Sequence, residues 1–404
     1  MKILIITQVF YPDTVSVSQH YTDIAMTLSN NGHQVEVLTS RFPYEDIELK
    51  YSKKENYNNL KINRLWQTKF GKKSNFLRML NFLTFNINVS LKLLFKSKKS
   101  YDLIFCSTSP PFLAFACVFT GKIKKKPVYY WVMDMQPELS IASGLIKKNA
   151  FATKLFSKLS DYSLKNSTKI FSLDRFMTSY ISSKEIDSTK ISTIPVWPVL
   201  DNIYTGERLQ NPFRIENNFK DKIVIMYSGN HAYVHPLETL LNAALLLKDH
   251  EEFLFVFIGG GVRKKDVTEF KIKNNLNNII QLPFQPRENI HFSLGSADIQ
   301  VVVLGDGQVG YTHPNKVYGA LFVGKPIIYI GPKESHVSDI LMNLVGNISV
   351  EHGEQFELKE KIIEFSKYSS DFVNEIVIKN KNYAQENLAP EFLKQKMSKE
   401  FKNN

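Results

Sequence analysis

The chain has 404 residues, of which 43% are apolar, so it is longer than one hydrophobic core usually supports and predicts two domains. Its two cysteines, Cys106 and Cys117, lie in apolar stretches and offer neither a disulfide framework nor the spacing of metal ligands. No signal peptide is recognised at the N-terminus, and we expect a cytoplasmic protein.

The N-terminal part alternates strand and helix signals. An apolar run at 2–7 predicts a strand, 18–30 has the apolar spacing of a helix, and Asn31-Gly32 ends that helix before a strand at 34–39. Further apolar strands are predicted at 103–106, 127–133 and 169–173. This order predicts a parallel, doubly wound α/β sheet.

A basic and apolar stretch interrupts this order. Residues 69–100 carry eight Lys or Arg and no Asp or Glu, within a formal net charge of +12. The stretch is too polar to span a membrane, and it predicts either a helix on an anionic membrane surface or a crossover helix with a solvated basic face. Nucleic acid is not expected, because no nucleic-acid-binding motif accompanies the charge. The predicted contact residues are Lys72, Lys73, Phe76, Lys96, Lys98 and Lys99.

The alternation breaks at 194–199, where Pro195 and Pro198 stop regular structure, and it restarts at residue 222. Strands are then predicted at 222–227, 253–258, 279–281, 299–304 and 326–330, with helices at 235–248, 265–274, 287–295 and 314–323. We predict one Rossmann-like domain over 1–195, a second over 205–370, and a helical tail over 371–404 that packs toward the first domain.

Two such domains predict a ligand cleft, because ligands of open α/β sheets bind at the carboxyl ends of the strands. The sequence has no Walker A, HExxH or GxSxG motif, and no GxGxxG after its first strand, which disfavours a nicotinamide enzyme.

Three turns of the second domain are candidates for holding a nucleotide diphosphate. Gly229 follows a strand and lets the backbone approach a phosphate, and Asn230 can donate a hydrogen bond. Gly259 and Gly260 end the next strand, with Arg263 within reach, although the same glycines fit a flexible loop. Phe284 follows a third strand, where it either lines a base pocket or belongs to the core.

The strongest candidate is the segment 310–328. Pro314 opens a predicted helix whose first N–H groups can bind an anion, and Lys316 adds a full positive charge. Asn315 and Tyr318 belong to the same candidate site.

Four motifs together resemble the retaining GT-B glycosyltransferases of family four, and within that family the branch that assembles O-antigen, capsule or colanic acid. They are Asn31-Gly32-His33-Gln34-Val35, Asp134-Met135-Gln136-Pro137-Glu138, Tyr227-Ser228-Gly229-Asn230, and Pro314-Asn315-Lys316 with Gly324-Lys325-Pro326.

The resemblance implies two Rossmann-like domains facing across a cleft. It implies transfer of a sugar from a nucleotide diphosphate donor, preferably UDP-linked, with no metal or other cofactor. The second domain would bind this donor and the first domain the acceptor, commonly a lipid-linked saccharide at the inner face of the cell membrane.

The sequence also departs from the family pattern. The family's Arg and Lys fall at Asn230 and His235, and its paired glutamates fall at Tyr311 and Gly319. We therefore expect Lys316 first and Arg263 second to meet the phosphate charge.

In the first domain, the family's His-Asp pair is Met133-Asp134 here. Asp134 is predicted either to orient the sugar or accept a proton, or to cap the next helix. His20 is a second catalytic candidate, or a packing residue.

Two other functions remain open on this sequence. One is a sugar-nucleotide epimerase on the same scaffold, and the other is a non-catalytic partner subunit, since fold does not fix function.

Overall fold

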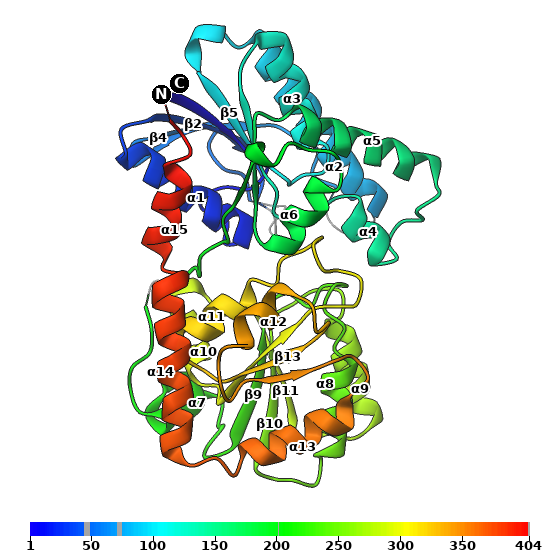
Figure 1. Ribbon diagram of the computed structural model, residues 1–404, viewed down its shortest axis with the longest axis vertical. Coiled ribbons are helices and arrows are strands. Elements are labelled where there is room, and N and C mark those ends of the chain that lie inside the picture. Colours follow the sequence, from blue (N-terminus) through cyan, green and yellow to red (C-terminus); the bar gives the residue numbers. More distant parts are fainter. Residues whose placement is uncertain (44–48, 71–74, 201, 403–404) are drawn as a thin grey trace. The chain divides into compact units, whose positions relative to one another are not determined.

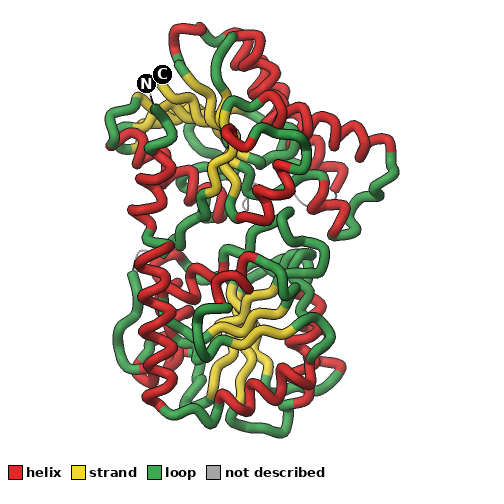
Figure 2. The backbone as a smooth tube through the Cα atoms, in the orientation of Figure 1, coloured by secondary structure: helices red, strands yellow, loops and turns green. Residues whose placement is uncertain are grey.

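The computed structural model describes residues 1–43, 49–70, 75–200 and 202–402, and the chain divides into two compact units. The first unit comprises Met1–Val196, Gly310–His313 and the chain from Pro390 onward. The second comprises Trp197–Val309 and Pro314–Ala389. In each unit a mainly parallel sheet lies between helices (Figure 1, Figure 2), which confirms the predicted fold class.

The first unit is built on an eight-stranded sheet in the order β3-β4-β2-β1-β5-β6-β7-β8. Its strands are β1 (Lys2–Ile6), β2 (Gln34–Ser40), β3 (Lys54–Tyr57), β4 (Leu60–Leu65), β5 (Leu103–Ser107), β6 (Val128–Trp131), β7 (Lys169–Ser172) and β8 (Ile191–Thr193). Among the strands that the structure describes in this sheet, only β3 pairs antiparallel, with β4. The central strands β1 and β5 are buried and apolar, as expected where helices cover both faces of a sheet.

The strand order reverses between β1 and β5, and because parallel crossovers are as a rule right-handed, the connecting helices on either side of this point cover opposite faces of the sheet. The helices are α1 (Ser16–Asn30), α2 (Asn75–Phe95), α3 (Leu113–Lys124), α4 (Glu138–Ala142), α5 (Phe151–Asn166), α6 (Arg175–Ser182) and α15 (Pro390–Ser398). The first helix, α1, packs with α15, whereas α3 packs between α2 and α5 on the opposite face.

The last described residues complete the core of the first unit. Asn31 donates to the Ser398 hydroxyl at 2.8 Å, and Lys169 pairs with Glu400 at 2.9 Å. The Phe401 ring is buried, with its centroid 5.1 Å from that of Phe105 and 5.8 Å from that of Phe171. The segment from Pro390 onward is therefore a structural part of this unit.

The second unit has a six-stranded, all-parallel sheet in the order β11-β10-β9-β12-β13-β14. Its strands are β9 (Ile223–Ser228), β10 (Phe253–Ile258), β11 (Ile279–Leu282), β12 (Ile299–Val303), β13 (Ile327–Ile330) and β14 (Ile348–Val350). The strand order reverses between β9 and β12, and ligands of doubly wound folds bind at such a switch point.

The helices of the second unit enclose a separate core on each face of the sheet. They are α7 (Pro212–Glu216), α8 (Glu238–Leu246), α9 (Lys264–Lys273), α10 (Ile290–Gly295), α11 (Lys316–Phe322), α12 (His336–Leu341), α13 (Gln355–Phe365) and α14 (Ser370–Asn387).

Candidate functional site

Two glycine turns lie side by side at the carboxyl ends of β9 and β10. Gly229 has φ +130° and Gly259 has φ +128°, a region that residues with a Cβ rarely adopt. A Cβ on Gly259 would collide with the Gly229 carbonyl, and one on Gly229 would lie 2.7 Å from the Lys316 Cε. These turns therefore require glycine, and they bring the backbone next to Lys316.

Lys316 is held by a short hydrogen-bonded chain at the switch point. The His235 Nδ1–H donates to the carbonyl of Val303 at 2.7 Å, and the Lys316 Nζ lies 3.1 Å from the His235 Nε2. Because Nδ1 carries the proton, Nε2 accepts from the ammonium. Burial, and then repulsion by Lys316, lowers the pKa of His235 well below its usual value, so this histidine is neutral.

The Lys316 ammonium has no carboxylate partner within 4.0 Å among the residues that the structure describes. Its Nζ lies 5.2 Å from the centroid of the Tyr227 ring, and burial lowers its pKa to about 8. Lys316 is half-buried, and a partly desolvated cation without a counter-ion is unfavourable, so a bound anion would stabilise it. At neutral pH this ammonium can therefore receive a phosphate.

Arg263, the second predicted cation, is already paired. Its Nη1 lies 2.7 Å from Glu238 and 3.6 Å from Asp266. Its charge is thereby largely neutralised, and it is a weaker anion-binding group than the sequence indicated. The side chain of Asn230 is exposed beside the glycine turns.

Phe284 is not a core residue. Its ring is 50% exposed and lies over the second glycine turn, 3.1 Å from the place that a Cβ on Gly260 would occupy. The interpretation of Phe284 as part of the core is therefore wrong.

The segment after β12 differs from its predicted form. The helix α11 begins at Lys316 and not at Pro314, and Pro314 and Asn315 precede it. Tyr318 is fully buried, with its hydroxyl 2.7 Å from the Nε2 of His336. The structure places Tyr318 in the core, so it does not support donor contact by this residue.

Asp134 lies after β6 in the first unit and accepts a hydrogen bond. Thr312 Oγ1 donates to its Oδ1 at 2.7 Å, and the backbone N–H of Met135 donates to the carbonyl of Tyr311 at 2.7 Å. Burial raises the pKa of Asp134, against the opposing effects of Thr312 and His313. The alternative role as a helix cap is wrong, because α4 begins at Glu138 and is preceded by Pro137.

A second contact between buried polar side chains, His313 and Asp174, is not among the sequence predictions. His313 Nδ1 lies 2.7 Å from Asp174 Oδ2, and Asp174 also accepts from the N–H of Met177 at 2.8 Å and caps α6. Asp174 follows β7 as Asp134 follows β6, and carboxyl ends of neighbouring parallel strands share one edge of a sheet. The position of both aspartates just after neighbouring strands is the sequence feature that could have identified Asp174.

His20 is a packing residue in this structure. It is buried, its Nδ1–H donates to the carbonyl of Ser16 at 2.7 Å, and its ring meets the Trp131 ring edge-on. No group of three or more His, Cys, Asp or Glu within the described ranges is placed to hold a metal ion.

Within the basic stretch 69–100, residues Asn75–Phe95 form α2, which has apolar residues on two faces. Phe85, Val89 and Leu93 are buried. Five other residues, each four positions from the next, are exposed: Met79, Leu83, Ile87, Leu91 and Phe95. The helix is thus a crossover helix that also presents an apolar stripe.

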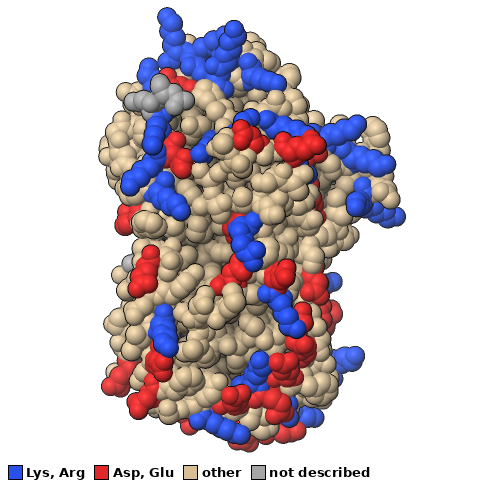
Figure 3. All heavy atoms as spheres, in the orientation of Figure 1, with Lys and Arg blue, Asp and Glu red and all other residues tan. Residues whose placement is uncertain are grey.

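The cations near α2 are not equivalent. Lys96 is ion-paired with Glu36 at 2.8 Å, whereas Lys98 and Lys99 are exposed. Lys72, Lys73 and the side chain of Phe76 lie outside the described residues. Figure 3 shows Lys and Arg gathered over the first unit and both charges mixed over the second. None of the helices within the described ranges is long and apolar enough to cross a membrane.

Comparison with known proteins gives consistent matches. Residues 210–382 match the family described as glycosyl transferases group 1. The chain is 24% identical over 256 residues to the probable glycosyltransferase WbjE of Pseudomonas aeruginosa, covering 62% of this chain and 62% of that relative, which is less than two thirds of its length. It is 22% identical over 340 residues to the putative colanic acid biosynthesis glycosyl transferase WcaI of Escherichia coli K12, covering 80% and 82%.

Among solved structures, HepE of Anabaena in complex with UDP and glucose is similar to this chain. The TM-score is 0.73 at 13% identity, and the match covers 99% of both chains. Both units therefore share the fold of that protein.

Proposed function

We propose that this chain, which has the GT-B fold and whose residues 210–382 match the glycosyl transferases group 1, transfers a sugar from a UDP-sugar to a lipid-linked saccharide in surface polysaccharide biosynthesis. The observation that carries the proposal is the Lys316 ammonium, which lies without a carboxylate partner beside two glycine turns at the switch point of the described second sheet. The name of WcaI, a putative colanic acid biosynthesis glycosyl transferase, supports the polysaccharide, and the UDP bound to HepE supports the nucleotide.

The residues take different roles in this proposal. Lys316 and the backbone around Gly229 hold the diphosphate, where negative charge grows as the sugar leaves. His235 keeps Lys316 in position through its neutral Nε2. Asp134, on the first unit, orients the reacting sugar or accepts the proton of the acceptor. Retention of anomeric configuration and independence of metal follow the family likeness.

The test is a donor screen followed by a transfer assay. UDP-, GDP- and dTDP-sugars are first compared by thermal shift, since a ligand that binds only the folded state raises the melting temperature. The stabilising donor is then incubated with a lipid-linked saccharide, with and without EDTA. We expect a UDP-sugar to stabilise the protein, and a product with retained configuration in both samples.

Other outcomes of this test would identify a different function. An epimerised sugar formed without any acceptor would show an epimerase. Failure of every nucleotide sugar to stabilise the protein would show a non-catalytic partner subunit.

The pH dependence of UDP binding should follow the ionisation of Lys316. Burial lowers the pKa of this amine to about 8, and only the protonated form attracts phosphate. The dissociation constant should therefore stay level near pH 7 and rise above pH 8, by up to about tenfold per pH unit. His231, whose pKa burial lowers to about 4, does not titrate there. Calorimetric titration with UDP between pH 7 and 9.5 measures this.

The matched variant for this measurement is Lys316→Met, which keeps an unbranched side chain one atom shorter and removes the charge. Its weaker UDP binding should not change with pH over this range. An affinity of the wild type that stays constant to pH 9.5 would show that Lys316 does not carry the phosphate charge.

We further propose that α2 lies on an anionic membrane at the inner face of the cell membrane, where a lipid-linked acceptor is found. The exposed apolar stripe and the exposed Lys98 and Lys99 fit a helix lying in the interface, with its apolar side chains in the bilayer and its cations at the headgroups.

Removing two surface cations should weaken this membrane binding. Lys98→Gln with Lys99→Gln should lower partitioning onto vesicles of anionic lipid by about thirtyfold at low salt, since each cation near such a surface contributes about 1 kcal/mol before screening. Co-sedimentation at low and high ionic strength measures the effect, and wild-type binding should itself fall with salt.

The control replaces two exposed lysines of the second unit, Lys265 and Lys273, by Gln, which changes the net charge equally. It should sediment like the wild type. If both double variants lose vesicle binding equally, the net charge of the protein and not the position of Lys98 and Lys99 determines binding. If the wild type does not bind vesicles, α2 is an ordinary crossover helix.

A further inference from the structure

The segment Gly310–His313, called the anchored segment below, is held on the first unit by two pairs of side chains. Thr312 Oγ1 donates to Asp134 Oδ1 at 2.7 Å, and His313 Nδ1 lies 2.7 Å from Asp174 Oδ2. The second pair is the more deeply buried, with 1% of the His313 side chain and 2% of the Asp174 side chain exposed. The proposed transfer reaction uses Asp134 and assigns no role to the second pair.

Asp174 is itself fixed at two points. Its Oδ1 accepts from the N–H of Met177 at 2.8 Å, as the N-cap of α6, and its Oδ2 contacts His313. Because an ionised carboxylate only accepts hydrogen bonds, the Nδ1–H of His313 is the donor. The two residues are 139 positions apart in the chain, so their pair fastens the anchored segment to the start of α6.

Thr312 lies between two residues that are each held by the first unit. Before it, the carbonyl of Tyr311 accepts from the N–H of Met135 at 2.7 Å, and after it, His313 contacts Asp174. A hydrogen bond weakens steeply when its length or angle departs from the preferred geometry. The bond from Thr312 to the carboxylate that it contacts therefore depends on both of these attachments.

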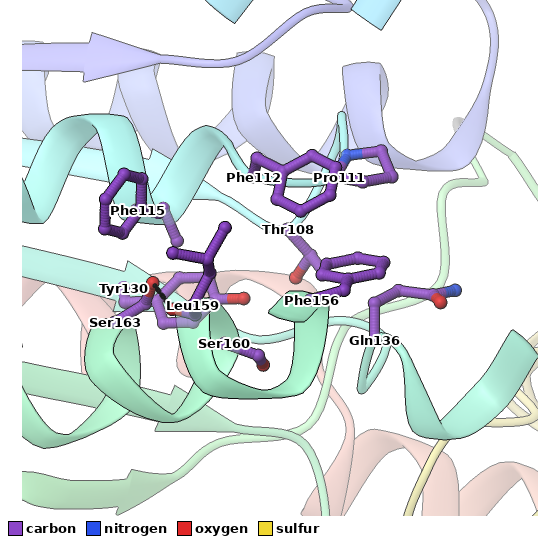
Figure 4. Close-up of a pocket in the computed structure, with 11 residues that line it drawn as sticks. Thr108, Pro111, Phe112, Phe115, Tyr130, Gln136, Phe156, Leu159, Ser160 and Ser163 are labelled. Atoms are coloured by element: carbon purple, nitrogen blue, oxygen red, sulfur yellow. Dashed lines mark hydrogen bonds between the residues drawn. The ribbon is translucent and has the colours of Figure 1, made fainter. Parts of the chain in front are cut away.

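The backbone beside Asp134 is also fixed. Thr108 Oγ1 accepts from the N–H of Met133 at 2.8 Å and donates to the carbonyl of Trp131 at 3.1 Å. Figure 4 shows Thr108 in the wall of a small pocket of the first unit. Asp134 is thereby prevented from following the anchored segment if that segment moves. Its hydrogen bond from Thr312 forms only while the segment is held in place.

The carboxylate of Asp134 uses one oxygen for this contact. Its Oδ1 accepts from Thr312, and no other hydrogen bond to this carboxylate is formed within the described ranges. Burial raises the pKa of Asp134, and the hydrogen bond from Thr312 opposes this rise by favouring the charged form. Loss of the bond would change both the orientation and the pKa of this carboxylate.

We propose that His313 and Asp174 are positioning residues, whose pair holds the anchored segment so that Thr312 orients the Asp134 carboxylate with one oxygen left for the reacting substrate. The benefit of this orientation for turnover rests on the role of Asp134 in the proposed function. The hold on the anchored segment is a property of the folded protein and can be measured without any substrate.

The first test compares two substitutions of His313 in the sugar-transfer assay. Asparagine has an amide N–H that can donate to Asp174 as Nδ1–H does, whereas phenylalanine keeps a ring and has no donor. We expect His313→Phe to lower kcat at least tenfold and to change the KM values of donor and acceptor less than twofold. His313→Asn should keep at least half of the wild-type kcat.

The second test is a double-mutant cycle that needs no transfer activity. The NMR resonance of the Asp134 carboxyl carbon, identified by its loss in Asp134→Asn, reports the pKa of this group. Both His313 variants lose the imidazole charge, which itself lowers the pKa of Asp134, so only the difference between the two variants measures the hold. The pKa of Asp134 should be higher in His313→Phe than in His313→Asn, and this difference should vanish when Thr312→Val is added to both.

The outcomes separate this proposal from the proposed function. A wild type that transfers no sugar would contradict the proposed function, and the pKa of Asp134 would still decide the positioning role. That role is overturned if His313→Phe keeps the wild-type kcat, if His313→Asn loses as much as His313→Phe, or if Asp134 has the same pKa in both variants. Melting temperatures show whether the variants fold, and His313→Ala, which has neither a ring nor a donor, replaces His313→Phe if the latter does not.

Discussion

Lys316→Ala is expected to weaken UDP binding by roughly 1.5–3 kcal/mol, the range for a hydrogen bond to a charged group. The ammonium lies beside the Gly229 turn, and no carboxylate of the described residues lies within 4.0 Å of it. The variant therefore removes a cation that a phosphate would pair with and breaks no ion pair of the free protein. Calorimetric titration with UDP at pH 7 measures the loss.

Arg263→Ala is the control for this change, because it also removes one cation from the same unit. Its guanidinium already pairs with Glu238 and Asp266, so UDP affinity should fall by less than about 1 kcal/mol. The melting temperatures of both variants show whether the second unit remains folded. Unchanged UDP affinity in a folded Lys316→Ala would remove Lys316 from the donor site.

Asp134→Asn is expected to lower turnover by about 10²-fold or more, the scale of a positioned acid–base group, and to leave UDP affinity nearly intact. Asparagine keeps an oxygen that can accept from Thr312, so the segment 310–313 stays attached and only the carboxylate is lost. Asp134 belongs to the first unit and Lys316 to the second, which separates the two measurements.

The control for Asp134 is Asp161→Asn, since Asp161 pairs with Lys184 on the same unit. It should keep wild-type turnover. Burial raises the pKa of Asp134, so the wild-type rate should fall as the pH drops through a value above that of an ordinary aspartate. Wild-type turnover by Asp134→Asn would exclude a catalytic role.

The fold was predictable from sequence wherever strands are buried on both faces. Strands such as β1, β9 and β10 are continuous apolar runs, and their alternation with helices indicates parallel order. The edge strand β3 is only partly buried and its sequence is polar, so no apolar pattern marks it. Its antiparallel pairing with β4 could be seen only in the structure.

The two glycine turns of the donor site were predictable from the order of the strands. Gly229 and Gly259 end neighbouring parallel strands, so their approach follows from the topology. Tyr318 could have been excluded from the site, because residues two apart on a helix point about 200° apart and Lys316 faces the glycine turn. The pairing of Arg263 with Glu238 joins residues 25 positions apart and depends on tertiary packing.

The first unit is built from three segments that are far apart in the sequence, so its last segment is synthesised only after the whole second unit. The rings of Phe105, Tyr129 and Phe171 are made early, but Phe401, which packs against all three, is among the last described residues. While the ribosome translates the second unit, these rings have no such cover, and exposed apolar surface on incomplete chains promotes aggregation. A nascent chain stalled before residue 390 should therefore bind chaperones more strongly than the full chain.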